Sequence, residues 1–174
     1  IDYMDGYRVF TWNDQLFPDR QAFFKEAKGL GFRVVPIVDP GVKYEKGYEA
    51  FDHAYENDLL CTTENGRPYI GQVWPGDTAF PDFNQEECRQ WWGEKSAELI
   101  KEGFSGIWND MNEPATGEIS ALSMLGKRDG ETISHNQFHN EYALLMAQST
   151  FEGLQNSQPN ERSFILSRAG AAGI

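Results

Sequence analysis

The sequence predicts an α/β fold, a (β/α)8 TIM barrel of which the chain covers about half. Apolar runs typical of strands alternate with segments of helical periodicity, in the order strand, helix, strand, helix, strand, helix, strand. Such a repeat forms a parallel sheet covered by helices. Each predicted strand also ends in a charged residue: Asp5, Asp39, Asp110 and Arg168. A barrel gathers its active site at the carboxyl ends of its strands, so these residues favour the barrel.

The length indicates how much of a barrel is present. Four strands are predicted where a barrel has eight, and the chain of 174 residues is shorter than the roughly 250 residues typical of a barrel. A doubly wound parallel sheet fits the same alternation. We expect residues 1–174 to be a partial catalytic barrel domain, and the remaining half of the barrel to be needed for a complete site.

The first part of the chain predicts one complete βα unit and a second strand. A strand tail over residues 1–5 is followed by an aromatic and polar loop over residues 6–17. Pro18-Asp19 opens a helix with apolar residues at helical spacing, and glycines end it. Residues 32–38 are a nearly unbroken apolar run, which is typical of a parallel strand covered on both faces.

A long irregular segment follows the second predicted strand. Residues 41–83 are rich in Gly, Pro and Tyr, and a loop of that length in a compact domain is usually functional or a small subdomain. One short helix is expected between residues 47 and 60. Asn65-Gly66 predicts a tight hairpin turn with Tyr69-Ile70 on the return arm. We expect this segment to be an active-site loop or insertion.

The second half of the chain predicts two more helices and two more strands. Their expected bounds are residues 84–101 and 136–153 for the helices, and residues 104–110 and 164–168 for the strands. Asn84 is the expected N-cap of the first of these helices, and Gly103 is expected to end it. Residues 115–135 are expected to form a polar loop.

Composition and charge exclude several classes of function. The net charge of −12 makes nucleic acid an unexpected partner. No apolar run approaches the roughly 20 residues that span a membrane, and no signal-like segment opens the chain, so no membrane association and a cytoplasmic location are expected. Cys61 and Cys88 are expected to be free thiols in a reducing compartment. The three histidines form no cluster with the cysteines and no phosphate-binding glycine loop is present, so neither a metal site nor a cofactor is expected.

The stretch from Gly106 to Pro114 carries the chemistry. It begins as a buried strand and continues into Asp110 and Glu113, which are three residues apart. Trp74 and Trp108 offer flat apolar surfaces on which sugar rings pack. Carboxylates, aromatic residues and Arg168, without a metal or cofactor motif, favour glycoside hydrolysis, which uses two carboxylates flanking an oxocarbenium-like centre.

A structural interpretation of the same residues stays open on pattern alone. Asp110 could cap a strand-to-loop turn, with Glu113 solvated. Trp74 could belong to the core, Arg168 could be an ion-pair partner, and Asp39 before a proline could be a turn residue. A further pair, His135 and His139, is expected to cap or pack a helix start.

The chain resembles glycoside hydrolase family 31, the retaining α-glucosidases. The strongest match is Trp108-Asn109-Asp110-Met111-Asn112-Glu113-Pro114. Other segments resemble the family in the same order, over essentially the whole chain. They are Ile1-Asp2-Tyr3-Met4, Phe10-Thr11-Trp12, Ile37-Val38-Asp39-Pro40, Val73-Trp74-Pro75-Gly76, Phe80-Pro81-Asp82-Phe83, Trp91-Trp92, His139-Asn140 and Ser167-Arg168-Ala169-Gly170.

The resemblance implies a role for each motif residue. Asp110 is implied to be the nucleophile that forms a covalent glycosyl-enzyme, and Glu113 a supporting acid rather than the proton donor. The substrate is implied to be an α-glucoside oligosaccharide, from which terminal α-linked glucose is removed. The residues implied to contact the glucose are Ile37, Asp39, Trp74, Trp108, Met111 and Arg168.

Three alternatives accompany this resemblance. In many retaining β-glycosidase barrels an Asn-Glu-Pro supplies the acid/base glutamate, which would be Glu113 here; the Trp108-to-Met111 stretch and the Val-Trp-Pro-Gly motif favour family 31. The family's acid/base aspartate lies in a later motif, beyond Ile174, so the chain alone is expected to be an inactive barrel fragment. Family 31 α-xylosidase, α-galactosidase and transglycosylase activities stay open, and Ala171 and Glu141-Tyr142-Ala143 depart from the family pattern.

Overall fold

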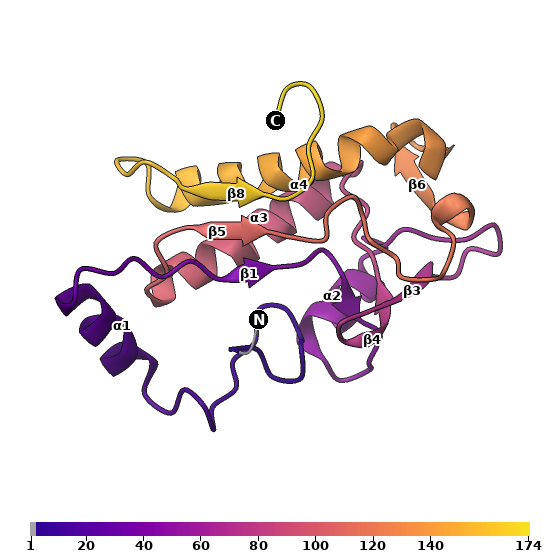
Figure 1. The fold of residues 1–174 in the computed structure, drawn as a ribbon. Coiled ribbons are helices and arrows are strands. Elements are labelled where there is room, and N and C mark those ends of the chain that lie inside the picture. The colour runs from indigo at the N-terminus through magenta and orange to yellow at the C-terminus, as the bar shows by residue number, and fades with distance from the viewer. Residues whose placement is uncertain (1–2) are drawn as a thin grey trace.

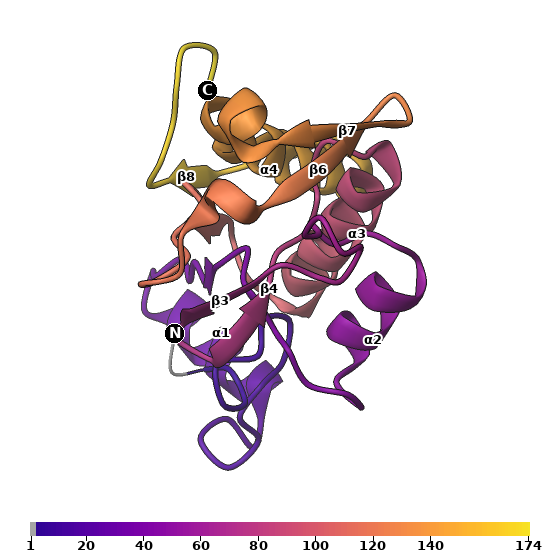
Figure 2. The ribbon, with the colours of Figure 1, turned by 90° about the vertical axis from the view of Figure 1, so that its right-hand side faces the viewer.

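The computed structural model describes residues 3–174, and its centre is a three-stranded parallel sheet. The strands are β1 (Ile37–Val38), β5 (Ile107–Asn109) and β8 (Ile165–Ser167), in the order β1-β5-β8. Helices α3 (Glu86–Glu102) and α4 (His135–Ser157) lie side by side behind this sheet (Figures 1 and 2). Consecutive parallel strands joined by helices on one face are the repeating unit of a (β/α)8 barrel. The predicted fold class is therefore confirmed.

The strand predicted over residues 32–38 is regular only at Ile37–Val38. Its carbonyl oxygens nevertheless pair with β5 along most of the run: Ser105, Trp108 and Asp110 donate backbone N–H groups to residues 34, 36 and 38 at 2.8, 2.9 and 3.2 Å. Pro36 has no N–H to donate toward the β5 side, where its carbonyl is bonded, so the regular ladder begins only at Ile37. The strand prediction was therefore too long because Pro36 interrupts the pairing.

The first predicted strand lies partly outside the described residues. Its described part, Tyr3–Asp5, forms a turn rather than a strand. The segment is held to the sheet by side chains: the Tyr3 hydroxyl donates to the Ile37 carbonyl at 2.9 Å, and the Trp12 ring stacks on Phe104 with 5.2 Å between centroids. The parallel strands seen in residues 3–174 are thus three of the four expected.

Helix α1 (Arg20–Gly29) confirms the expected helix after Pro18-Asp19. Asp19 is its N-cap, and the Asp19 carboxylate accepts a hydrogen bond from the Ala22 N–H at 2.9 Å. Phe24 is the helix's buried residue, and it packs edge-on against Phe104 with 5.0 Å between ring centroids. This contact places the helix against the loop that leads into β5.

The segment over residues 41–83 is a folded unit with its own sheet. It contains β2 (Val42–Lys43), α2 (Glu49–Glu56), β3 (Ile70–Val73) and β4 (Gly76–Ala79), and the strands form an antiparallel sheet in the order β2-β4-β3. The short helix and the turn at Asn65-Gly66 are confirmed, with a bridge between Thr62 and Pro68. The β3–β4 hairpin was not predicted; its tip is Trp74-Pro75, between the paired residues Val73 and Gly76.

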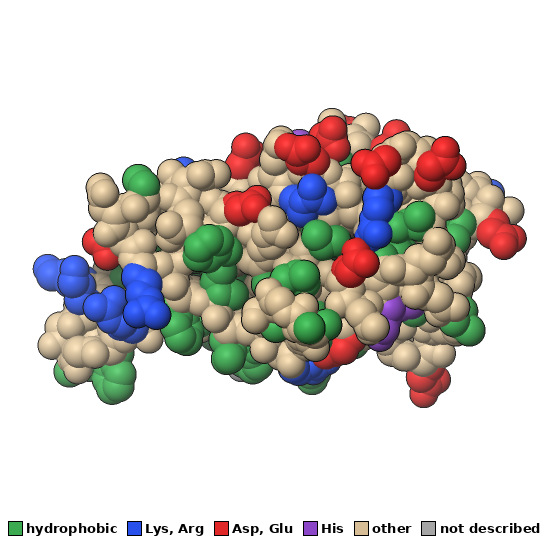
Figure 3. Space-filling view, turned by 90° about the horizontal axis from the view of Figure 1, so that it is seen from above, with side chains coloured by type: hydrophobic (Ala, Val, Ile, Leu, Met, Phe, Trp, Pro, Cys, Tyr) green, Lys and Arg blue, Asp and Glu red, His purple; other side chains and the backbone are tan. Residues whose placement is uncertain are grey.

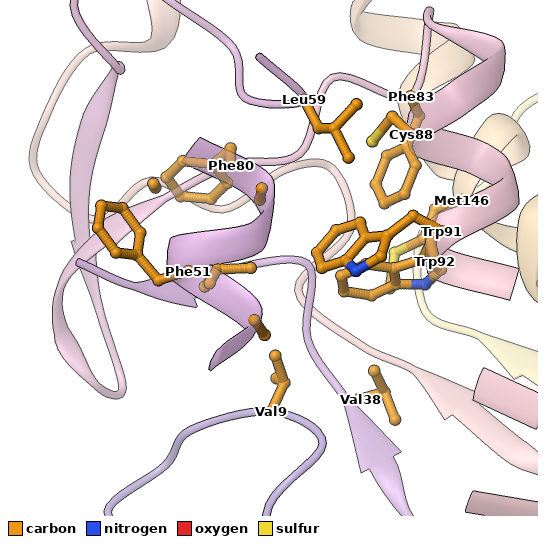
Figure 4. Close-up of a cluster of buried hydrophobic side chains, with 14 of the residues drawn as sticks. Val9, Val38, Phe51, Leu59, Phe80, Phe83, Cys88, Trp91, Trp92 and Met146 are labelled. Atoms are coloured by element: carbon orange, nitrogen blue, oxygen red, sulfur yellow. The ribbon is translucent and has the colours of Figure 1, made fainter. Parts of the chain in front are cut away.

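Helix α3 supplies much of the hydrophobic core. Cys88, Trp91 and Trp92 are buried, and they face Phe80 and other apolar residues of the insertion (Figure 4). The predicted N-cap, Asn84, is one residue too early: the N-cap is Gln85, and the Asn84 amide donates instead to the Asp82 carboxylate at 2.8 Å. Gly103 ends the helix as predicted, with φ of 136°.

The expected polar loop over residues 115–135 contains a short 3-10 helix, η1 (Ala121–Ser123), and a hairpin of β6 (Leu125–Arg128) and β7 (Glu131–Ser134). Asp82, which is fully buried, accepts a hydrogen bond from the Lys127 N–H at 2.6 Å and so anchors this hairpin. Helix α4 then begins after Ser134, whose side chain forms a capping box with Gln137. It ends at Ser157, so the predicted end at Gly153 was wrong.

Charged side chains are unevenly distributed over the surface. On the face shown in Figure 3, acidic side chains gather along one long edge, whereas basic side chains gather at the end where the parallel strands begin. The basic group therefore lies away from the carboxyl ends of the strands. Among the helices of residues 3–174, none has the length and apolar character to cross a membrane. The absence of a nucleic-acid partner stays a prediction.

Candidate active site at the carboxyl ends of the strands

The two faces of the parallel sheet differ in burial. In β5, Ile107 and Asn109 are fully buried on the helix side, and the Asn109 amide donates to Thr150 of α4 at 3.3 Å. Trp108, between them, is 36% exposed on the opposite face. Alternate residues of a strand point to opposite faces, so Asp110 lies on the Trp108 side of the sheet.

Strand register brings the predicted residues together on that face. Ile37 pairs with Trp108 in β1 and β5, and Trp108 pairs with Leu166 in β8. Two residues further along each strand, the same face carries a charged residue. These residues are Asp39, Asp110 and Arg168. Sequence positions more than 120 residues apart thus form one row of charges at the carboxyl edge.

Arg168 joins the two acids of the central motif. Its Nε and Nη2 donate to Glu113 Oε1 and Oε2 at 2.8 and 2.6 Å, a bidentate pair. Arg168 Nε also lies 3.1 Å from Asp110 Oδ1, but this ion-pair contact has no hydrogen-bond geometry. Asp110 Oδ1 is buried and has no hydrogen-bond partner among residues 3–174. Asp110 therefore lies in the field of the guanidinium, and its side chain is only 11% exposed.

The paired charges shift the protonation of Glu113 and Arg168. The hydrogen bonds from Arg168 hold the pKa of Glu113 below its usual range, and they outweigh the opposing effect of burial. The same pair raises the pKa of Arg168. Glu113 is consequently an ionised partner of Arg168 at neutral pH, which makes it poorly suited to donate a proton.

Asp39 is the second buried acid of the row. It is 6% exposed, and its Oδ1 has no hydrogen-bond partner in the described part of the chain. Burial raises its pKa to about 6, with a further contribution from Asp110 and an opposing one from Arg168. The folded protein therefore keeps a proton on Asp39 at mildly acidic pH, where an ordinary aspartate has lost it.

We expect replacement of Asp39 with asparagine to stabilise the protein at pH 7. Because the folded-state pKa is raised to about 6 from 3.8, proton binding by Asp39 contributes stability below about pH 4, and this contribution is lost as the pH rises through 6. The neutral amide avoids that loss, so the gain at pH 7 is at most about 3 kcal/mol. Urea unfolding of both proteins at pH 4 and pH 7 measures the gain in the free energy of unfolding. A gain of equal size at both pH values contradicts the raised pKa of Asp39. Asp129→Asn, at an exposed turn, is the matched control and should change neither.

The chain leaves β5 in an uncommon backbone conformation. Met111 has φ of 55°, in the left-handed region, and its carbonyl oxygen accepts a hydrogen bond from the Ala115 N–H at 2.9 Å. Met111 and Trp74 both line an open hollow of about 510 Å³, although they come from different segments. The turn after β5 and the β3–β4 hairpin therefore meet beside the row of charges.

Trp74 is an exposed ring rather than a core residue. It is 55% exposed at the tip of the β3–β4 hairpin, and its ring lies beside that of Tyr7 with 6.1 Å between centroids. Tyr7 is itself 39% exposed and was not predicted as a site residue. Two exposed aromatic rings from separate segments thus lie side by side at the tip of the hairpin.

Two polar residues beside this site, Asn112 and Ser167, were not predicted as site residues. Asn112 is fully buried, and its amide contacts Ser167 and Ala169 on either side of Arg168. The motif containing Asn112 was recognised, but nothing in its spacing shows which strand its side chain reaches.

The expected pair His135 and His139 packs at the start of α4, with 2.9 Å between His139 Nδ1 and His135 Nε2.

Comparisons with known proteins match the whole chain to one family. The family model described as the glycosyl hydrolases family 31 TIM-barrel domain matches residues 1–174. Alpha-glucosidase 2 of Bacillus thermoamyloliquefaciens is 41% identical over 177 residues, which cover 100% of this chain and 22% of that protein. The alpha-glucosidase of Saccharolobus solfataricus is 34% identical over 197 residues, which cover 100% of this chain and 28% of that protein.

Solved structures show the same fold. The glucosidase II alpha subunit in a Glc1Man2-bound crystal structure matches with a TM-score of 0.87 and 30% identity, over 99% of this chain and 19% of that chain. A family 31 alpha-glucosidase from Bacteroides thetaiotaomicron matches with a TM-score of 0.78 and 34% identity, over 98% of this chain and 27% of that chain. The chain thus spans about a fifth to a quarter of the length of these relatives.

Proposed function

Because this chain belongs to glycoside hydrolase family 31, as part of the TIM-barrel domain, we propose that the full-length protein is a retaining α-glucosidase. Its substrate is an oligosaccharide with a terminal α-linked glucose. Asp110 attacks the anomeric carbon, the bond to the leaving sugar breaks, and a covalent glycosyl-enzyme forms. Water then releases glucose with retention of configuration.

One observation supports Asp110 as the nucleophile above the others. Its carboxylate is buried at the end of β5, with an Oδ1 that accepts no hydrogen bond within residues 3–174, and the positively charged Arg168 lies 3.1 Å from that oxygen. The Asp110 side chain is still 11% exposed, on the Trp108 side of the sheet. A carboxylate at the carboxyl end of a barrel strand can contact a sugar bound there.

The state of Glu113 argues against the β-glycosidase alternative. An acid/base glutamate has to carry a proton before the first step, and this is achieved by a raised pKa. Glu113 is instead held by the Arg168 fork, which lowers its pKa. We assign it the supporting role of fixing Arg168.

The remaining residues of the row suit a glucose pocket. Asp39 offers a buried carboxylate oxygen without a partner in the described chain, which can accept a sugar hydroxyl. Trp108 and Trp74 supply exposed apolar rings, and Ile37 and Met111 lie next to them in the sheet and the hollow. Arg168, 43% exposed at its side chain, can donate to the sugar as well as to Glu113.

Three parts of this proposal go beyond the fold and family. The acid/base residue is expected in a motif that this chain does not contain, so residues 1–174 alone are expected to be inactive. Glucose is preferred over xylose or galactose, and hydrolysis over transglycosylation, because the named relatives are alpha-glucosidases. The cytoplasmic location stays a prediction from the sequence.

Covalent trapping tests the proposed function. Incubation of the full-length protein with 5-fluoro-α-glucosyl fluoride should add one fluoroglucosyl group to the intact mass, and peptide mapping should place it on Asp110. The isolated 174-residue chain should not be labelled. The corresponding xylosyl and galactosyl fluorides are the matched controls for sugar preference. Labelling at Glu113, or no labelling of the full-length protein, contradicts the proposal.

A further inference from the structure

We propose that Asn112 is a positioning residue for the reaction, because its amide bonds the Ser167 hydroxyl and the Ala169 N–H on the two sides of Arg168 and so holds the guanidinium between Glu113 and Asp110. This inference rests on the proposed function, since it concerns the same nucleophile. The contacts that carry it lie beyond the sheet, where the parallel ladder has ended.

The Asn112 side chain makes two hydrogen bonds, and each uses a different end of the amide. Nδ2 donates to Ser167 Oγ at 2.8 Å, and Oδ1 accepts from the Ala169 N–H at 3.1 Å. Ser167 Oγ in turn donates to the Ala169 carbonyl at 2.7 Å, which closes a small network around Arg168. Asn112 is fully buried in this network. Residues 167 and 169 are thus both tied to one side chain.

Residues 109–113, at the end of β5 and just after it, hold Arg168 through three kinds of contact. Its backbone N–H donates to the Asn109 carbonyl at 3.0 Å, its neighbours are bonded to Asn112, and its guanidinium is bonded to Glu113. Positions 109, 112 and 113 of one segment thus fix the backbone, the flanking residues and the head group of Arg168. Without Asn112, the backbone before Arg168 would still be bonded to the Asn109 carbonyl, but the Ala169 N–H after it would lose its partner.

The position of the guanidinium matters because it lies close to Asp110 without a hydrogen bond to Oδ1. At 3.1 Å without a hydrogen bond, Arg168 stabilises the negative charge of Asp110 but leaves Oδ1 free. A displacement of the guanidinium away from Asp110 removes the nearby positive charge, and a rotation toward Asp110 forms a hydrogen bond to its carboxylate. The other titratable groups near Arg168 and Glu113 are Asp39, which follows β1, and His139 of α4. Loss of positioning is therefore expected to alter reactivity as well as stability.

The test uses Asn112→Ala and Ser167→Ala in the full-length protein with an aryl α-glucoside. A misplaced group in an active site costs about 100-fold, so we expect kcat/KM of Asn112→Ala to fall by about that factor, mainly through kcat. The acidic limb of the pH profile of kcat/KM should move to higher pH, because a displaced Arg168 no longer holds the pKa of Glu113 below its usual range. Ser167→Ala, which removes one member of the network, should shift both in the same direction by less.

Thr150→Val is the matched control, because Thr150 bonds the Asn109 side chain on the helix face of the same strand and does not contact Arg168. It should lower the melting temperature and leave the pH profile unchanged. If Asn112→Ala and Ser167→Ala behave like Thr150→Val, Asn112 is only structural and the inference is overturned. If Asn112→Ala does not fold, the pH profile of Ser167→Ala decides alone. An unmodified protein that is not labelled at Asp110 refutes the proposed function separately.

Discussion

Replacement of Asp110 with alanine in the full-length protein is expected to lower kcat for an aryl α-glucoside by about 10⁴-fold or more. The reason is that no other described side chain can take its place. Asp39 lies on the neighbouring strand with a raised pKa, and Glu113 is occupied by two hydrogen bonds from Arg168. The measurement is initial-rate kinetics, with circular dichroism to verify that the variant is folded.

Chemical rescue distinguishes a missing nucleophile from a damaged site. Added azide should restore turnover of an activated substrate by Asp110→Ala and yield a β-glucosyl azide, because the small anion attacks from the side that the carboxylate has left. Glu113→Gln is the matched control: it weakens the Arg168 pair but keeps the nucleophile, so it should lose less activity and gain nothing from azide. An active Asp110→Ala, or an azide rescue confined to the Glu113 variant, contradicts the assignment of Asp110.

The residues of the site could be predicted because each lies in a recognisable place on its strand. Asp39, Asp110 and Arg168 follow apolar runs, and the carboxyl ends of parallel strands meet at one edge. What pattern alone could not provide is the pairing among them. That Arg168 bonds Glu113 but not Asp110 Oδ1 depends on the direction of the guanidinium N–H groups, since both oxygens lie within 3.1 Å of Nε. The role of Asn112 was missed for the same reason.

The fold was predictable where one face of a helix or strand is buried, because the burial leaves a periodic apolar pattern. It was less predictable over residues 41–83 and 115–135, because hairpins and their strand register depend on a few turn residues. The sequence does contain one such signal that was overlooked: Asp129-Gly130 joins β6 and β7, with φ of 53° and 82°. That combination is typical of a type I′ hairpin turn. The tip of the β3–β4 hairpin, Trp74-Pro75, has no comparable signal, because Trp is not a preferred turn residue.

Gly153 shows why a glycine in a helix cannot be interpreted from the sequence alone. It was expected to end a helix, since glycine is the commonest terminating residue. It lies instead within α4, at the point where α4 crosses α3. A Cβ atom on Gly153 would come within 2.1 Å of the Gly93 carbonyl oxygen and 2.4 Å of its carbonyl carbon. The two helices approach this closely only because both positions lack a side chain.

Replacement of Gly153 with alanine is therefore expected to destabilise the protein, although alanine favours helix formation by about 1 kcal/mol over glycine. The clash is with the backbone of Gly93, which cannot rotate away as a side chain could. The helices must separate, and overpacking of this kind costs about 3 kcal/mol. Urea unfolding followed by tryptophan fluorescence measures the net loss, and the adjacent Trp91 and Trp92 report on this crossing.

Gly29→Ala is the matched control, because Gly29 is the last residue of α1 and an added Cβ would meet nothing within 4 Å. It should be neutral or slightly stabilising, so the difference between the two variants isolates the contact from the helix propensity. Equal effects of both substitutions would mean that α3 and α4 can separate at little cost. The position of β5 and β8 against these helices, and with it the spacing between Asp110 and Arg168, would then depend on the strands themselves.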